Sequence, residues 1–337
     1  MVYRFNRDPI IDDGRTLRVD RMRVNSFSKR GIGSNTTQGF RTGGAPPPGS
    51  TPDAAHNTIE KFPFSSDANA TDVGDLTVAR GDHSCTNSSI SVYSAGGKGG
   101  SAGNAPATNV IDKFPISSGG NATDVGDLTV SGRATAGQQS ASNGYTAGGY
   151  IGPSPAAMQD RIDKYSFSSD ANANDIGNLT VARNRNTGQS SLTHGYSSGG
   201  GTFPPFVVKN EIDKFPFSSD TNATDVGDLV TNTENAGGQS SGENGYASGG
   251  WGPGNLNVIQ KFPFSADAGS SDVGDLTEAR GSIGGGSSSE NHGYASGGSD
   301  PSSAVNTIDK FPFSRDTNAT DVGDLTISTR NSGAAQG

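Results

Sequence analysis

The apolar residues of this chain fall in short clusters that recur at regular positions. In one stretch Ile59, Phe62 and Phe64 are followed, after a polar turn, by Val73 and Leu76. Short apolar clusters bounded by Gly, Ser, Asn and Asp are typical of β-strands connected by turns. The pattern therefore predicts an all-β chain, and its regularity argues against intrinsic disorder.

One unit is repeated six times. The first aromatic residue of an IDKFPF-like segment marks each copy, with spacings of 52, 51, 50, 47 and 49 residues: Phe62, Phe114, Tyr165, Phe215, Phe262 and Phe311. A second segment keeps the same register: GFRTGG at 39, VYSAGG at 92, GYTAGG at 144, GYSSGG at 195, and GYASGG at 245 and 293. A period of roughly 50 residues is that of one propeller blade.

Each unit offers four strands. A stretch of small and polar residues, such as residues 186–191, suits the crowded strand nearest a propeller axis. The GYxSGG, IDKFPF and DVGDLTVA segments supply the other three strands; the Tyr is placed to pack between blades, and the Gly-Gly pair permits positive φ. We therefore predict a six-bladed β-propeller over residues 30–337, preceded by an N-terminal arm over residues 1–29.

Two stretches are candidates for the strand that closes the ring, because residues 30–38 and residues 330–337 both resemble the inner strand. A propeller must join its ends, since an open ring leaves a bare sheet edge. Either the C-terminal RNSGAAQG or the N-terminal stretch inserts into the first blade. We expect the N-terminal stretch to insert and the C-terminal tail to stay free.

The turn before the fourth strand, SSDANATD in the first copy, has only Asn or Gly at its fifth position: Asn69, Asn121, Asn172, Asn222, Gly269 and Asn318. These residues enter the left-handed region most easily, so we expect φ > 0 there, with Asp67 accepting backbone N–H bonds. The spacing of Asp67, Asn69, Thr71 and Asp75 also resembles a calcium loop. We favour a self-satisfied turn and keep bound calcium as the alternative.

Charge is unevenly distributed along the chain. The formal net charge is −9, but residues 1–30 hold eight basic and four acidic residues, so the rest holds 17 basic and 30 acidic residues, a net −13. A repeat region with this net negative charge repels the phosphate groups of a nucleic acid, which argues against nucleic-acid binding. The chain lacks 18 consecutive apolar residues, and its first 30 residues lack an apolar signal-peptide core. We therefore expect neither membrane insertion nor classical secretion.

The unit resembles the kelch repeat, with an aromatic residue before Gly-Gly, a variable loop, a strand like IDKF and a strand ending near an Arg. The resemblance covers about residues 30–330 and implies a kelch-like propeller. The kelch Trp is missing, because the single Trp251 lies in a loop. The tandem segments, such as IEKFPFSSDANATDVGDLTVAR at 59–80, also look like repeats of marine bacteriophage virion proteins, which implies a role in a particle.

The titratable residues form no recognisable catalytic set, so we predict no enzyme activity, no cofactor and no metal site. The single cysteine, Cys85, excludes an intrachain disulfide and leaves the redox compartment open. Cys85 and the nearby His83 are interpreted as parts of a surface loop. His194 and His292 share one repeat position and are interpreted as loop residues.

The loop after Gly-Gly differs in every copy, and all six of these loops share one face of the predicted ring. Variable loops on a constant scaffold are a common way to carry a binding surface. The candidate ligand-binding residues there are Tyr150, Phe203, Phe206 and Trp251, whose rings can stack on sugars or pack against protein. Ordinary loop packing is the alternative.

The leading hypothesis is a non-enzymatic structural and binding protein of a phage virion, in the tail, a fibre or a head decoration. The arm then contacts other virion proteins or a second copy of the chain, and the loops face a host-surface glycan or protein. A terminal strand that lies on the propeller rim is the equal alternative for residues 1–29. The alternative is a cellular kelch or lectin-like propeller, soluble and of unassigned compartment, that binds glycan or protein through the same loops. An oxidase or sialidase is the third hypothesis.

Overall fold

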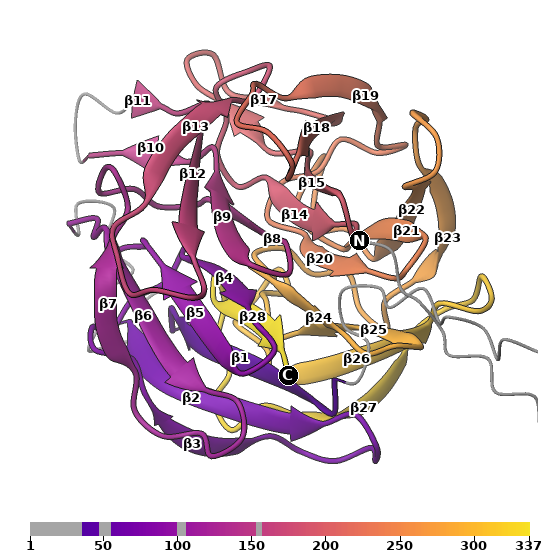
Figure 1. Ribbon diagram of the computed structural model, residues 1–337. Helices are drawn as coiled ribbons and strands as arrows, with labels where there is room; N and C mark the ends of the chain where they lie inside the picture. Colours follow the sequence, from indigo (N-terminus) through magenta and orange to yellow (C-terminus); the bar gives the residue numbers. More distant parts are fainter. Residues whose placement is uncertain (1–35, 47–54, 100–105, 153–156) are drawn as a thin grey trace, which may run out of the picture. The chain divides into compact units, whose positions relative to one another are not determined.

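The computed structural model describes residues 36–46, 55–99, 106–152 and 157–337. Within these residues the chain forms six four-stranded antiparallel sheets and two short hairpins, without a helix. The sheets stand in a ring (Figure 1), and residues 31–337 form one compact unit. This confirms the predicted six-bladed β-propeller. No helix in the described part of the chain is long and apolar enough to cross a membrane.

Every sheet has the same strand order from the axis outwards. The inner strands are β28 (Gly333–Gln336), β4 (Ser84–Asn87), β8 (Ala136–Gln139), β14 (Thr187–Ser190), β20 (Gly237–Ser240) and β24 (Gly286–Ser288). The second strands are β1 (Gln38–Gly44), β5 (Ser91–Ala95), β9 (Asn143–Ala147), β15 (His194–Ser198), β21 (Asn244–Ser248) and β25 (His292–Ser296).

The third strands are β2 (His56–Pro63), β6 (Val110–Pro115), β12 (Arg161–Ser166), β18 (Glu211–Pro216), β22 (Val258–Pro263) and β26 (Thr307–Pro312). The outer strands are β3 (Thr71–Asp75), β7 (Thr123–Asp127), β13 (Asn174–Asn178), β19 (Thr224–Asp228), β23 (Ser271–Asp275) and β27 (Thr320–Asp324). The hairpins are β10 (Tyr150–Ile151) with β11 (Ala157–Met158), and β16 (Gly201–Thr202) with β17 (Val207–Val208).

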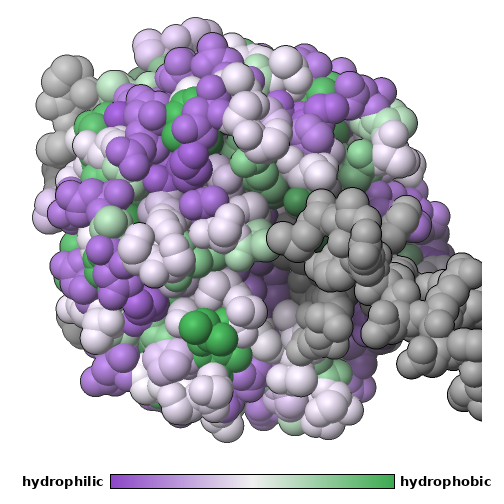
Figure 2. Space-filling model, viewed as in Figure 1, coloured by the Kyte–Doolittle hydropathy of each residue, from purple (hydrophilic) through white to green (hydrophobic). Residues whose placement is uncertain are grey.

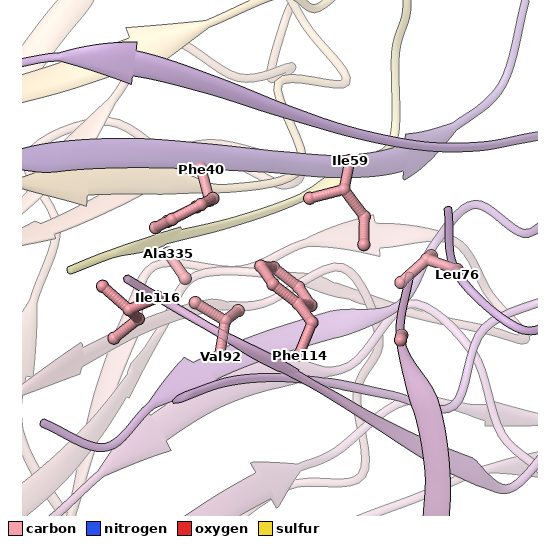
Figure 3. Packing of buried hydrophobic residues seen from close by; sticks show 8 residues of the cluster. Phe40, Ile59, Leu76, Val92, Phe114, Ile116 and Ala335 are labelled. Atoms are coloured by element: carbon pink, nitrogen blue, oxygen red, sulfur yellow. The ribbon is translucent and has the colours of Figure 1, made fainter. Parts of the chain in front are cut away.

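The hydrophobic core lies between neighbouring blades. The Tyr of each second strand stacks on a Phe of the next blade, with ring centroids 4.4 to 4.9 Å apart: Tyr93–Phe167, Tyr145–Phe217, Tyr196–Phe264, Tyr246–Phe313 and Tyr294–Phe64. Between the first two blades Phe40 and Phe114 pack edge to face at 5.4 Å, beside Ile59 and Val92 (Figure 3). The predicted packing of the Tyr between blades is confirmed.

The Asn of each turn between third and fourth strands contacts the preceding blade, and the prediction of positive φ at this position is wrong. Asn121 Oδ1 accepts the N–H of Asp75 at 3.0 Å, and four further copies repeat the bond: Asn172 with Asp127, Asn222 with Asn178, Asn318 with Asp275, and Asn69 with Asp324. In the fifth copy Gly269 lacks a side chain, and Ser270 Oγ accepts the N–H of Val230 instead. The hydrogen bond to the preceding blade therefore explains why Asn recurs at this position.

Positive φ occurs instead at the Gly of each outer strand, with values from 147° to 154°. A Cβ on Gly74 would lie only 2.4 Å from the backbone carbon of Gly120 in the next blade. Glycine at this position therefore meets both a conformational and a packing requirement. The Gly-Gly pairs after the second strands also have positive φ, as expected.

Buried charges join neighbouring blades near the loop end of the third strands. Asp112 accepts bonds from the N–H and hydroxyl of Thr77, at 2.9 and 2.6 Å, and pairs with Arg80 at 3.0 Å. The trio recurs twice: Thr180, Arg183 and Asp213, and Thr277, Arg280 and Asp309. In the fourth-to-fifth junction Thr233 replaces the Arg and Gln260 replaces the Asp. There the buried pair is neutral.

The C-terminal strand closes the ring, which overturns our expectation that the N-terminal stretch would do so. β28 is the inner strand of the first blade and pairs with β1, while Gln38 lies in β1 as part of the second strand. Residues 30–35 of the expected strand lie outside the described residues. β28 fits because Ala335 packs with Phe40 and Val92, and because Gly333 leaves room for Cys85.

Candidate ligand-binding site on the loop face

The loops after Gly-Gly and the connections from outer to inner strands lie at the same end of the blades, which we call the loop face. In the third and fourth blades the hairpins β10–β11 and β16–β17 extend this face. Each connection contains a non-glycine residue with φ of 52° to 57°: Asp82, Ala134, Arg185, Asn235, Ser282 and Asn331. These residues stand at equivalent positions around the axis.

Backbone hydrogen bonds tie these six connections into a closed ring. The N–H of Ala134 donates to the carbonyl of Asp82 at 2.6 Å, and the N–H of Arg185 donates to Ala134 at 2.7 Å. The other bonds run from Asn235 to Arg185, Ile283 to Asn235, Asn331 to Ser282 and Asp82 to Asn331. The ring fixes the backbone from which the side chains of Asp82 and Arg185 extend.

A hollow of about 350 Å³ opens beside this ring, between the loops of the second, third and fourth blades. Its lining residues are Asp82, Lys98, Arg133, Ala134, Tyr150, Met158, Asn184, Arg185, Phe203 and Phe206. Phe203 and Phe206 are 56% and 47% exposed, although large apolar side chains are usually buried. We call this hollow the loop-face hollow.

The aromatic residues of the hollow are held by neighbouring side chains. The guanidinium of Arg133 lies over the ring of Tyr150, 4.7 Å from its centroid. The ring of Phe206 packs against Trp251 at 5.8 Å. Both contacts restrict the rings while leaving an aromatic surface toward the hollow.

Three cations and two carboxylates surround the hollow. Lys98 Nζ lies 3.5 Å from Asp82 Oδ2, and Arg185 Nη1 lies 2.8 Å from Glu234 Oε1. The side chain of Arg185 is 43% exposed, whereas that of Glu234 is 4% exposed. Burial raises the pKa of Glu234, and the charge of Arg185 opposes this shift.

The structure brings together three of the four predicted ligand-binding residues. Tyr150, Phe203 and Phe206 line the loop-face hollow, whereas Trp251 packs against Phe206 and is not a lining residue. Sequence reasoning missed Lys98, Arg133 and Arg185. The available signal was their position, since each lies in a loop-face segment of an otherwise acidic body.

A second hollow, of about 70 Å³, follows the axis between the inner strands. The strands approach so closely that a Cβ on Gly188 would lie 2.0 Å from the carbonyl oxygen of Gly137. Polar side chains of its wall bond from blade to blade: Ser190 Oγ accepts the N–H of Gln139, and Ser240 Oγ accepts that of Ser190. These groups hold the blades together.

Cys85 and His83 do not form a surface-loop pair, which corrects our interpretation of them: His83 is buried just before β4, and Cys85 is half-buried within β4. His83 is 2% exposed, and Thr42 Oγ1 lies 2.8 Å from His83 Nε2 and 3.1 Å from Cys85 Sγ. Burial lowers the pKa of His83 well below its ordinary value and raises the pKa of Cys85. Both groups are therefore neutral, as suits a buried junction between the first two blades.

The buried neutral His83 predicts a loss of stability in acid. Its pKa is 6.5 when unfolded and lower when folded, so the unfolded chain binds the extra proton as the pH falls below 6.5. Stability is expected to fall by up to about 1.4 kcal/mol per pH unit in that range. His194 and His292 are the half-buried first residues of β15 and β25, which corrects our interpretation of them as loop residues. Urea unfolding of His83→Asn should show a flatter pH dependence, whereas His194→Asn should keep most of the slope. An equally steep slope in His83→Asn would contradict this assignment.

The acidic turns at the opposite end of the blades form contacts between blades. Asp67 pairs with Lys310 of the sixth blade rather than accepting bonds within its own turn, and Asn69 binds the backbone of Asp324. Four more Lys–Asp pairs repeat the contact: Lys113–Asp170, Lys164–Asp220, Lys214–Asp267 and Lys261–Asp316. The prediction of a self-satisfied turn in which Asp67 accepts backbone N–H bonds is therefore wrong, because these side chains bind the neighbouring blade instead. The oxygens named as calcium ligands point to different partners, which does not favour the calcium alternative.

The ring of six four-stranded sheets defines a β-propeller, and the loop-face hollow gives it a ligand-sized concavity. No protein-family model matches the chain, and no curated protein matches it. The kelch and virion resemblances therefore rest on the repeated segments alone.

Proposed function

We propose that this protein is a non-enzymatic binding module that takes up a saccharide in the loop-face hollow. The observation that carries the proposal is the pair of exposed rings, Phe203 and Phe206, in a hollow of about 350 Å³. That volume lies at the low end of small-ligand pockets, which span roughly 300 to 1,000 Å³. Exposed aromatic rings beside a few polar groups suit the apolar faces and hydroxyl groups of a sugar.

A binding role also agrees with the state of the titratable groups. The carboxylates beside the hollow, Asp82 and Glu234, each contact a cation rather than each other. His83 is buried and Cys85 is half-buried, and desolvation shifts the pKa of each toward its neutral form. These arrangements serve structure and ligand contact better than proton transfer, which uses groups poised to change protonation at a substrate.

We propose that this module is part of a bacteriophage particle, because its tandem segments resemble repeats of marine bacteriophage virion proteins. The described chain enters the first blade at Thr36 and ends at Gly337, where the N–H of Thr37 donates to the Gly337 carbonyl at 2.6 Å. β1 runs from there toward its Gly-Gly loop, so the chain joins the ring at the end away from the loop face. Absence of the protein from purified virions by mass spectrometry would favour the cellular lectin-like alternative.

Truncation of the exposed rings tests the binding site. Phe203→Ala and Phe206→Ala are each expected to weaken saccharide binding about tenfold on a glycan array and in calorimetry, because they remove contact surface from the hollow. The matched control is Leu192→Ala, which removes a side chain of equal exposure, 56%, from a hairpin on the opposite face. Unchanged affinity in both Phe variants, or equal loss in Leu192→Ala, contradicts the proposal.

A further inference from the structure

The charge of the loop-face hollow is opposite to that of the body around it. Residues 31–337 hold 17 basic and 30 acidic residues. Yet three of those 17 cations, Lys98, Arg133 and Arg185, line this one hollow, and the described carboxylates at or beside it are Asp82 and Glu234, which leaves an excess of one positive charge. A local excess of positive charge on an acidic protein concentrates anions at that place and repels them elsewhere.

The three cations come from three consecutive segments of the ring. Lys98 follows the Gly-Gly pair of the second blade, and Arg133 and Arg185 lie in the next two connections. At the position of Arg133, the other copies have Gly81, Asn184, Glu234, Gly281 and Arg330. The propeller fold therefore does not require a cation at this position, and the residue type there can vary with the function of the loop face.

Arg185 is the cation best placed to meet a ligand. Its side chain is 43% exposed, and it is anchored through Nη1 to Glu234, which is almost fully buried. The closed ring of backbone bonds fixes its main chain. A guanidinium held in this way presents a planar set of donors that matches a carboxylate or a sulfate.

From this juxtaposition of cations and aromatic rings we propose that the ligand is an acidic saccharide. Its carboxylate or sulfate group lies against Arg185, Arg133 and Lys98, and its sugar ring packs on Phe203 and Phe206. The inference deepens the proposed function and rests on it. A hollow of about 350 Å³ suits one or two sugar rings better than a protein surface, because stable protein interfaces cover about 800 Å² on each partner.

Paired probes test the acidic group. A panel of uronate, sialylated and sulfated oligosaccharides is compared with the same oligosaccharides after esterification or desulfation. We expect binding among the acidic probes, about tenfold weaker binding after the charge is removed, and weakening of the acidic probes as salt is raised. Failure to bind any acidic probe, or equal binding of the neutralised partners, overturns the inference. Equal binding of a polyglutamate peptide overturns the assignment to a saccharide.

Substitutions in the cations locate the contact. Arg133→Gln and Arg185→Gln are expected to weaken acidic probes about tenfold, while the control Arg330→Gln, at the repeat position of Arg133 in the sixth copy, leaves binding unchanged. Arg185→Gln removes the partner of buried Glu234, so Arg185→Gln/Glu234→Gln serves as a second variant that leaves no unpaired charge. Acidic-probe affinity equal to that of the wild type in this second variant counts against the site.

The two levels of the proposal fail in different ways. Binding of neutral saccharides that is lost in Phe203→Ala and kept in Arg185→Gln overturns the acidic ligand and keeps the saccharide site. Binding that no hollow variant changes overturns the proposed function itself.

Discussion

Deletion of residues 333–337 is expected to abolish the cooperative unfolding transition of the propeller. The deletion removes β28, exposes the edge of β1 and takes Ala335 out of the core between the first two blades. We expect a loss of at least about 5 kcal/mol, which is comparable with the whole stability of a typical domain. Thermal unfolding followed by circular dichroism measures the loss.

A second truncation controls for the loss of a chain end. Deletion of residues 1–30, which lie outside the compact unit of residues 31–337, should leave the transition of the ring in place. Addition of a peptide with the sequence of residues 330–337 should partly restore the transition of the C-terminal truncation, because the inner-strand position is then filled again. A C-terminal truncation that melts like the full chain would show that ring closure does not hold the blades together.

The second large effect concerns the buried pair of Arg183 and Asp213, whose side chains are fully buried and 3.2 Å apart. Arg183→Thr leaves the carboxylate of Asp213 buried without its cation and is expected to cost about 3 to 5 kcal/mol in the free energy of unfolding. Another junction of the same chain shows which pair of substitutions should recover this loss. At Thr233 and Gln260 the same junction is neutral, and Gln260 Oε1 accepts the N–H of Thr231 at 2.8 Å.

The double variant Arg183→Thr/Asp213→Gln is therefore expected to recover most of the loss in urea unfolding. In addition, Nε and Nη1 of Arg183 have no hydrogen-bond partner within the described residues, so the native pair is itself imperfectly satisfied. The exposed pair of Lys214 and Asp267 is the control, since Lys214→Gln should cost less than about 1 kcal/mol. A double variant as unstable as Arg183→Thr would mean that the lost Arg packing, not the unpaired charge, sets the cost.

The sequence by itself determined the unit, the number of copies, the four strands of each copy and the Tyr that packs between blades. It also determined that the variable loops share one face, and it selected Tyr150, Phe203 and Phe206, which line one hollow. These features follow from short-range patterns, because strand periodicity and turn chemistry act over a few residues and are then repeated six times.

Only the tertiary structure determined which side chains form contacts between the copies. The Asn of the turn has a side-chain bond to another blade, the buried Arg selects its Asp across a junction, and Lys98, Arg133 and Arg185 meet from three separate segments. Ring closure shows the physical reason. Both chain ends carry a plausible inner strand, and the choice depends on packing against residues such as Phe40 and Cys85, which lie hundreds of positions away from β28.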